Sequence, residues 1–331
     1  MPDLSPKENY LRALRHEETE YVPIGVGGDL ARCGGNMPCE KGDPDANVAD
    51  AFGVHWTRSD AALGAFIPVT KYFVLKDITQ WKKTIAIPRM EDYDWKRLAE
   101  QDRAAIDPGK RQALGFFSHC GVWERLAALM GFEEAMIALV EEPEACDELF
   151  AMITDYKIKL AEAAAQYYNA DVFVNFDDLA TERNLFMSPE TYRKLIKPHH
   201  RRLNDAVRNL GMIPVQHTCG YAETCIDDYI ETGAEAWNSV QPSNDIAALL
   251  DRYGDRFVFE GGFDSTGKPG RPDASLEEIE AEVERCFREY GGRKGFVFLG
   301  TLVNSAGNKN AAAQSRIMFE TANRIRFTGK K

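Results

Sequence analysis

The chain has 331 residues, an apolar fraction of 44% and a formal net charge of −12. This length suits one large α/β barrel, and the apolar content supports an extensive core. The acidic charge excludes broad binding to a phosphate backbone, because nucleic-acid binding normally needs a basic stripe and the sequence has none. No apolar run approaches the roughly 18 residues of a membrane span, so we expect neither nucleic acid nor a membrane as a partner.

The seven cysteines are scattered and odd in number, and none belongs to a CxxC pair. This usage favours reduced thiols over a disulfide framework. The N-terminal segment MPDLSPKENYLRALRHEETEY is charged and has the pattern of an amphipathic helix, without the apolar region of a signal peptide. We therefore expect a cytoplasmic protein.

The first predicted strand is YVPIGVGG, which starts at Tyr21. After it, residues from about 32 to 99 hold clusters of Gly, Pro and Asp. We predict that they form a long excursion, with a small β element, folded over the mouth of a barrel. Because the sequence shows no internal repeat, linker or low-complexity tract, we expect one barrel domain over residues 1–331, with a helical extension at its N-terminus.

From about Ala113 onward, short apolar segments rich in Val and Phe alternate with longer charged segments of helical periodicity. The apolar segments are ALGFFSH, ADVFVNFDD, MIPVQHTCG, AEAWNSVQP, RFVFEGGFD and GFVFLGTLV. Strands that each feed a helix indicate a parallel sheet buried on both faces. The predicted fold class is therefore α/β, in the form of a closed (β/α)8 TIM barrel. A doubly wound open sheet is the alternative, but no GxGxxG motif follows the first strand.

Two of the predicted helices carry start signals. Ser188 stands before Pro189, which fits a cap followed by a first-turn proline. Ser275, with Glu278 three residues further on, fits a capping box. Both signals support the alternation of strands and helices.

Polar residues follow the predicted strands at the end where such a barrel carries its chemistry. They are Asp29, His119, Asp177, Asp178, His217, Cys219, Gln241, Glu260, Asp264, Thr301 and Asn304. Buried polar groups cost free energy unless they are paired, so a ring of this kind indicates a binding site. Each member also has a structural interpretation, since the two aspartates could cap a turn and His119 could be a core histidine.

The stretch VQHTCGYAETC places His217 and Cys219 two residues apart at a strand end. Residues i and i+2 of a strand point to the same side, so the imidazole and the thiolate can converge on one metal ion. We predict a zinc site in which the third protein ligand comes from Glu260, Asp264 or Gln241. The alternative is that Asp178 holds His217 as an acid and that no metal binds.

The chain resembles the uroporphyrinogen decarboxylase superfamily, and within it the corrinoid-linked methyltransferases. The resemblance runs over nearly the whole length. It rests on RHEETEYVPIG, DAFGVHW, VLKDITQW, FFSHCGVWERLAALMGFEEAMIALVEEPE, FDDLATERNLFMSPETYRKLIKPHHRRL, HTCGYAETCIDDYIETGAEAWNSVQP and FEGGFDS. The resemblance implies a (β/α)8 barrel with a single funnel-shaped site.

The superfamily includes several chemistries. Its decarboxylases have an arginine-bearing motif at the end of the first strand, whose arginines pair the acidic groups of a tetrapyrrole. Here the same place reads GVGGDLARCGG, with Arg32 alone. Its zinc methyltransferases use His-x-Cys, an acidic residue on the next strand and a late cysteine. His217 and Cys219 match, whereas the acidic position falls on Gln241 and the late cysteine position on residues 301–304.

The segment FDDLATERNLFMSPETYRKLIKP is most similar to members that demethylate aromatic methyl ethers. This resemblance implies a methyltransferase that moves a methyl group from a small methoxylated aromatic to the Co(I) of a corrinoid-binding partner protein. Breaking an aryl methyl ether requires a Lewis acid or a general acid on the oxygen. The catalytic candidates are His217, Asp178, His119 and Glu260, and the candidates for substrate contact are Asp177, Gln241, Asn304, Phe176 and Trp237. The alternatives are a decarboxylase-like lyase and a non-catalytic barrel that binds a ligand.

Overall fold

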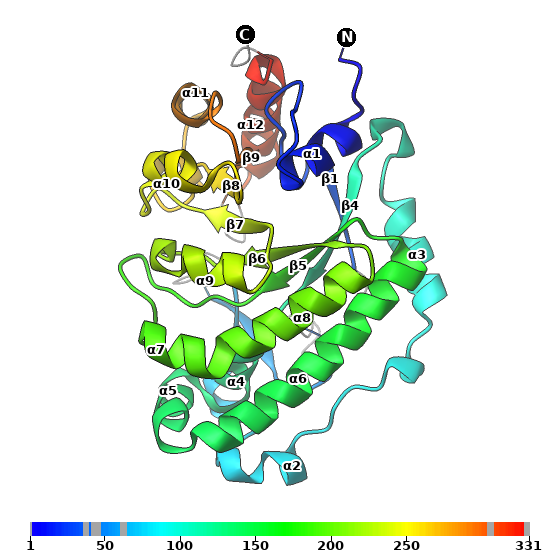
Figure 1. Ribbon diagram of the computed structural model, residues 1–331, viewed down its shortest axis with the longest axis vertical. Helices are drawn as coiled ribbons and strands as arrows, with labels where there is room; N and C mark the ends of the chain where they lie inside the picture. Colours follow the sequence, from blue (N-terminus) through cyan, green and yellow to red (C-terminus); the bar gives the residue numbers. More distant parts are fainter. Residues whose placement is uncertain (1, 36–39, 41–47, 60–64, 303–307, 328–331) are drawn as a thin grey trace.

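The computed structural model describes residues 2–35, 40, 48–59, 65–302 and 308–327 (Figure 1). Within this part of the chain, a curled parallel sheet has the strand order β1-β4-β5-β6-β7-β8-β9. Its strands are β1 (Leu30–Cys33), β4 (Ala113–Ser118), β5 (Val172–Phe176), β6 (Ile213–His217), β7 (Ala236–Val240), β8 (Val258–Gly262) and β9 (Phe296–Leu299). The six strands predicted from Ala113 onward are all present, and the predicted (β/α)8 fold class is confirmed.

The segment before β1 joins the two edges of the sheet. Ile24 forms a parallel bridge with Phe298 of β9, and Val26 forms one with Leu30 of β1. The strand predicted from Tyr21 is therefore reduced to isolated bridges. The reason is a tight turn in which Gly27 has a φ of 90° and its N–H donates to the carbonyl of Leu30 at 2.9 Å.

Helices cover the outside of the sheet, and Figure 1 shows the long α6 and α8 side by side. The helices are α1 (Pro6–Leu14), α2 (Trp81–Thr84), α3 (Trp95–Ala104), α4 (Val122–Met130), α5 (Phe132–Glu141), α6 (Pro143–Ala163), α7 (Pro189–Thr191), α8 (Lys197–Asn209), α9 (Ile226–Glu231), α10 (Ile246–Tyr253), α11 (Leu276–Tyr290) and α12 (Ala311–Ile325). None of the described helices is long and apolar enough to cross a membrane.

The predicted helix start signals are confirmed. The Ser188 hydroxyl accepts from the backbone N–H of Thr191 at 3.0 Å. Ser275 and Glu278 form a complete capping box at the start of α11. Ser5 forms a second one with Glu8, which fixes the start of α1.

Side chains alternate between the two faces of the sheet. One apolar cluster fills the barrel interior and includes Leu30, Val174, Val215 and Val258, together with Tyr10 from α1. The other cluster lies between the sheet and the helices. Because the Lys7 N–H of α1 bonds to the carbonyl of Arg111 just before β4, α1 closes the N-terminal end of the barrel. The opposite end, where the strands finish, remains for the site.

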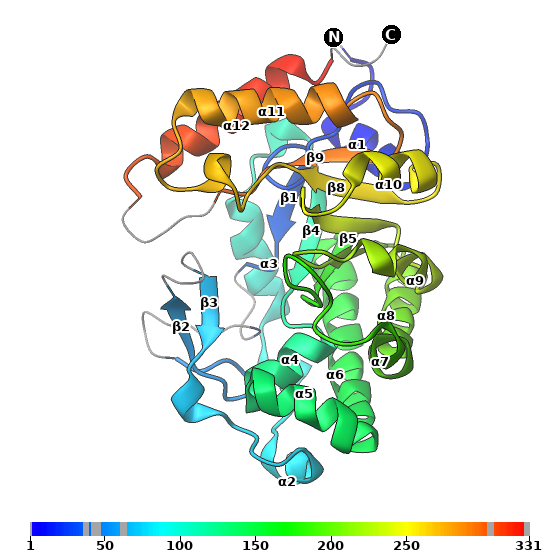
Figure 2. The same ribbon diagram turned by 90° about the vertical axis from the view of Figure 1, so that its left-hand side faces the viewer.

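A long excursion separates β1 from β4. It contains the antiparallel hairpin of β2 (Trp56–Ser59) and β3 (Ala65–Pro68), which stands beside α4 and α5 in Figure 2. Short 3-10 turns at Thr70–Tyr72, Ile78–Gln80 and Met90–Asp92 follow, together with α2 and α3.

Two buried ion pairs fasten the excursion to the barrel. Arg125 of α4 pairs with Asp50, and Lys157 of α6 pairs with Glu40 at 3.0 Å. All four side chains are at most 2% exposed. Removing one partner of such a pair leaves an uncompensated buried charge, which typically costs about 3–5 kcal/mol. The pairs therefore hold the excursion in a defined position against α4 and α6.

Candidate active site

Three potential metal ligands converge at the C-terminal ends of β5 and β6. The ligand atoms of Asp178, His217 and Cys219 all lie within 4.8 Å of one another. The His217 Nε2 is 3.5 Å from the Cys219 Sγ and 3.8 Å from the Asp178 Oδ1. The Cys219 N–H donates to the Asp178 Oδ1 at 2.7 Å, which fixes the carboxylate beside the thiol.

The turn after Cys219 is held by close backbone contact. Gly220 has a φ of 87°, and a Cβ at this position would lie 2.4 Å from the carbonyl oxygen of Thr181. Only glycine fits such a conformation at this distance. The Gly220 N–H also donates to the Gln241 Oε1 at 2.7 Å, so the loop that carries Cys219 is fixed from two sides.

The orientation of His217 is set by Asn238. The His217 Nδ1 lies 2.6 Å from the Asn238 Oδ1. An amide oxygen can only accept, so the Nδ1 carries the proton and the Nε2 lone pair points toward Cys219 and Asp178. This is the tautomer that a metal ligand requires.

Asn238 is in turn oriented from deeper in the barrel. Its side chain neighbours the carboxylate of Glu260 across the sheet, and this carboxylate accepts from the Tyr10 hydroxyl at 3.0 Å. A carboxylate attracts the amide NH2, which leaves the amide oxygen facing His217. The strand register supports this chain of contacts, because His217, Asn238 and Glu260 are direct neighbours across β6, β7 and β8.

Burial changes the acidity of two groups in this region. It raises the pKa of Glu260 to about 7, and the polar groups of Tyr10 and Asn238 only partly oppose this effect. Burial, together with the nearby Asp178 carboxylate, raises the pKa of the Cys219 thiol well above its usual value. A divalent cation bound between the Asp178 carboxylate and the Cys219 thiol would oppose the effects of burial and of the Asp178 charge on the thiol, and would favour the thiolate.

An aromatic wall continues from His217 around the mouth. The Phe176 ring stacks on the His217 ring with centroids 3.8 Å apart and an angle of 21°. The His119 ring packs against the same Phe176 ring, with the two ring centroids 4.5 Å apart. Arg32 of β1 hydrogen-bonds to the His119 Nε2 and lies over Phe117 at 5.2 Å. The structure thus places the predicted residues Phe176 and His119 at the mouth. Phe176 separates His119 from the donor group, by which we mean Asp178, His217 and Cys219.

The third potential ligand is not one of the three that we expected. Asp178 occupies that place, whereas Glu260 lies deeper and bonds to Tyr10. The Gln241 side chain accepts from the Gly220 N–H and donates from its Nε2 to the Ser265 hydroxyl at 3.1 Å. It therefore positions two loops. The Asp264 carboxylate accepts from the Gly267 N–H at 2.7 Å and shapes its own turn.

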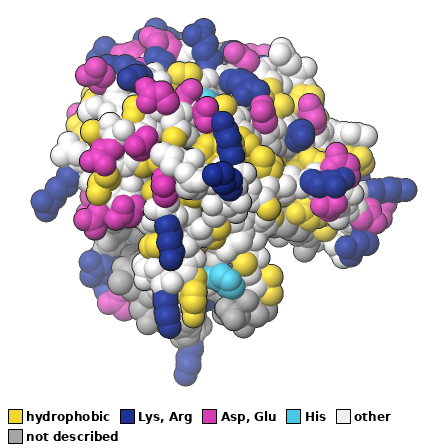
Figure 3. All heavy atoms as spheres, turned by 90° about the horizontal axis from the view of Figure 1, so that it is seen from below, with side chains coloured by type: hydrophobic (Ala, Val, Ile, Leu, Met, Phe, Trp, Pro, Cys, Tyr) yellow, Lys and Arg dark blue, Asp and Glu magenta, His cyan; other side chains and the backbone are white. Residues whose placement is uncertain are grey.

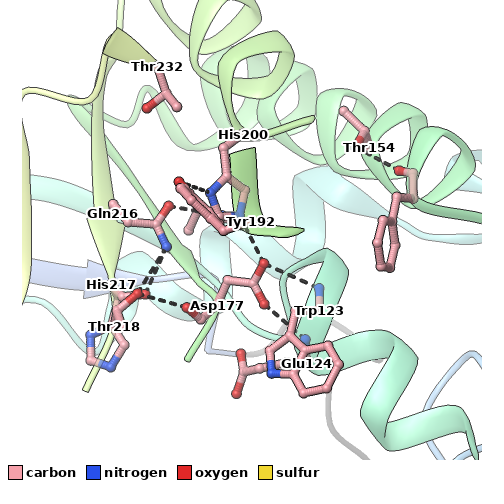
Figure 4. Close-up of polar contacts among 12 residues, drawn as sticks. Trp123, Glu124, Thr154, Asp177, Tyr192, His200, Gln216, His217, Thr218 and Thr232 are labelled. Atoms are coloured by element: carbon pink, nitrogen blue, oxygen red, sulfur yellow. Dashed lines mark hydrogen bonds and ion pairs between the residues drawn. The ribbon is translucent and has the colours of Figure 1, made fainter. Parts of the chain in front are cut away.

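Asp177 does not contact the site, contrary to our expectation. It is fully buried, and its carboxylate accepts from the backbone N–H of Glu124 at 2.9 Å and lies 2.8 Å from the His200 Nε2 (Figure 4). Adjacent residues of an extended chain point to opposite sides, so Asp178 faces the mouth and Asp177 faces the helices. Asp177 therefore caps the start of α4 and anchors α8 through His200.

Trp237 is also wrongly predicted as a substrate contact. It is 0% exposed, its indole N–H donates to the carbonyl of Thr218 at 2.8 Å, and its ring packs on Tyr229 and Phe259. It belongs to the layer between sheet and helices, while its neighbour Asn238 points into the barrel. The strand alternation in AWNSV would have identified Asn238 as the inward residue. The remaining candidate, Asn304, lies outside the described residues.

Comparisons with known proteins identify a family and a similar fold. Residues 109–300 match the family described as uroporphyrinogen decarboxylase (URO-D). A uroporphyrinogen decarboxylase from Thermus thermophilus is 30% identical over 144 residues, which cover 42% of this chain and 40% of that enzyme. A methyltransferase from Methanosarcina mazei has a similar fold, with a TM-score of 0.70 at 15% identity over 96% of this chain and 99% of that one.

The raised pKa of Glu260 predicts a specific pH dependence of stability. Its ordinary value is 4.5, so between pH 4.5 and about 7 the folded chain keeps a proton that the unfolded chain has lost. The stability gained from the neutral form is complete below pH 4.5 and is lost as the pH rises toward 7, by about 3 kcal/mol in total. In Glu260→Gln this loss is absent. Urea unfolding of both proteins at pH 4.5, 6 and 8 measures it, and a constant difference between them would contradict the assignment.

The bond from Asn238 predicts an effect on metal affinity. In Asn238→Leu the His217 ring loses its partner, and outer partners of this kind are typically worth 10–100-fold in metal affinity. We expect zinc affinity, measured by competition with a chromophoric chelator, to fall by about that factor. The matched control is Asn175→Leu, which changes a buried asparagine of β5 that bonds to Gln216 and not to the donor group. The double change His217→Ala, Cys219→Ala should abolish binding, and stoichiometric zinc in that protein would refute the site.

Proposed function

The chain belongs to the uroporphyrinogen decarboxylase family, and we propose that it acts within this family as a methyltransferase. It moves a methyl group from a small methoxylated aromatic to the Co(I) of a corrinoid on a separate partner protein. The observation that carries the proposal is the convergence of Asp178, His217 and Cys219 at the mouth of the barrel.

The three residues fit a zinc ion. Nitrogen, sulfur and oxygen donors are the ligands that zinc takes in proteins, and catalytic zinc sites use three protein ligands with a fourth position left open. The oriented Nε2 of His217 and the close spacing of the three ligand atoms meet this requirement. When bound there, zinc supplies a Lewis acid for an ether oxygen.

The residues of the chain perform the remaining tasks. Asn238 and Glu260 hold His217 in one tautomer, so its Nε2 needs no reorganisation during the reaction. The Phe176 ring covers one face of the imidazole and excludes water from it. In the reaction the methyl carbon leaves the ether oxygen for cobalt, and the electron pair of the C–O bond stays on the oxygen. The products are a phenolate, which takes a proton from solvent, and the methylated partner.

The geometry at the end of β1 disfavours the decarboxylase alternative. A tetrapyrrole with several acidic groups requires several fixed cationic forks. In the stretch GVGGDLARCGG, Arg32 is the sole cation, and its guanidinium is engaged with His119 and Phe117. This arrangement does not provide the several forks that decarboxylation of such a substrate would need.

The proposal predicts how the loss of His217 affects turnover. Losing one well-placed group that stabilises developing charge typically costs on the order of 10²–10³ in rate. His217→Ala should lose about this factor with a poor leaving group and less with a good one, because an acidic phenol needs less help. The measurement is a rate series over aryl methyl ethers of varied phenol acidity, with a Co(I) corrinoid as the methyl acceptor.

A second histidine provides the control for this series. His199 of α8 is also buried and pairs with a carboxylate, since its Nε2 lies 2.8 Å from Asp147. It is remote from the mouth, so His199→Ala should leave the rates unchanged. If His217→Ala loses the same factor for every ether, His217 does not act on the leaving oxygen. If the wild-type chain transfers no methyl group from any ether, the proposed function is wrong.

A further inference from the structure

A groove of about 410 Å³ runs between the β2–β3 hairpin and the helices α4 and α5. Its lining is dominated by apolar and aromatic side chains. It is lined by Trp56, Phe66, Ile67, Pro68, Thr70, Phe73, Trp123, Glu124, Ala127, Ala128, Gly131, Phe132, Asp178 and Phe186. Figure 3 views the end of the molecule that carries α2 and α5, where apolar side chains reach the surface between charged ones.

The wall of the groove on the side of α4 and α5 is a cluster of aromatic rings. Phe132 contacts Phe186 edge-on at 5.0 Å between centroids and Trp123 at 5.7 Å. Phe132 is 51% exposed, so part of this cluster is open to a ligand. Flat rings bind well in such a place, because they bury apolar area and make edge-to-face contacts.

The polar end of the groove is acidic. Glu124 and Asp178 line it, and no lysine, arginine or histidine is among the described residues of the lining. Asp178 is also a proposed zinc ligand, so the repulsion of a ligand carboxylate is strongest in the metal-free chain, where both acidic side chains lie in an otherwise apolar environment and are weakly screened. The charges therefore favour a ligand that is neutral or cationic.

The groove reaches the cluster of potential metal ligands at Asp178. Asp178 belongs to both, and its Oδ1 lies 3.8 Å from the His217 Nε2. A volume of this size is within the range of small-molecule sites and accommodates a single substituted ring. A ring in the groove therefore directs one substituent toward Asp178, His217 and Cys219.

We infer that the groove binds the ring of the methylated substrate and selects aromatic ethers that are neutral or cationic over those that carry a carboxylate. This inference rests on the proposed function for the identity of the reacting group. The ring lies between the hairpin and the cluster of Phe132 and Phe186, with its methoxy group at the Asp178 end. The excursion after β1 thus supplies one wall of the substrate site.

Three ligands of nearly the same shape test the charge preference: 4-methoxytoluene, 4-methoxybenzylamine and 4-methoxybenzoate. Trp56 and Trp123 line the groove, so quenching of tryptophan fluorescence reports binding without any methyl acceptor. We expect the amine and the toluene to bind at least tenfold more tightly than the benzoate. Equal or tighter binding of the benzoate would overturn the inference.

Two substitutions locate the ligand. Ala127 lines the groove, and Ala127→Leu should weaken binding of 4-methoxytoluene at least tenfold by filling the space. Val140 of α5 is 75% exposed and outside the lining, so Val140→Leu should have no effect. Phe132→Ala, at a partly exposed position, provides a second test and should also weaken binding. Unchanged affinity in both groove variants would place the ligand elsewhere and contradict the inference.

The outcome for the groove is separate from the outcome for the reaction. Binding that depends on Ala127 and on ligand charge, without methyl transfer, supports the groove and contradicts the proposed function. Methyl transfer that is unaffected by Ala127→Leu supports the function and contradicts the groove. If none of the three ligands binds, the groove does not take an aromatic ether.

Discussion

The hydrogen bond between the His217 Nδ1 and the Asn238 Oδ1 is the constraint on which the chemistry of the mouth depends. It decides which nitrogen of the imidazole carries the proton, and so whether a lone pair faces Asp178 and Cys219. The Glu260 carboxylate, which Tyr10 supports from α1, lies beside Asn238 and favours the orientation in which the amide oxygen faces His217. A helix at the closed end of the barrel therefore helps to orient a residue at the open end.

The rest of the architecture brings different parts of the site to this histidine. The parallel sheet places the ends of β5 and β6 side by side, so that Asp178 and Cys219 approach one imidazole. The excursion after β1 contributes the apolar groove, and the buried pairs with Arg125 and Lys157 hold it against α4 and α6. Polar and apolar recognition thus come from separate segments that meet at Asp178.

Much of the fold followed from the sequence, because strands buried on both faces have a distinct pattern that alternates with amphipathic helices. The pairing of His217 with Cys219 followed from their spacing. Asp177 and Asp178 were harder, since their directions depend on where β5 ends. Trp237 was misassigned because its aromatic character outweighed the alternation that put Asn238 inside. Tyr10 could not be foreseen, because its contact with Glu260 spans 250 positions in the chain.

X-ray absorption spectroscopy at the zinc edge of the zinc-loaded protein tests the central claim most directly. We expect one sulfur ligand at roughly 2.3 Å, with nitrogen and oxygen ligands at roughly 2.0–2.2 Å and the signature of one imidazole. The sulfur should disappear in Cys219→Ala and remain in Cys225→Ala, which changes a fully buried cysteine outside the donor group. Two sulfur ligands, or none, in the unmodified protein would contradict the Asp178, His217 and Cys219 site.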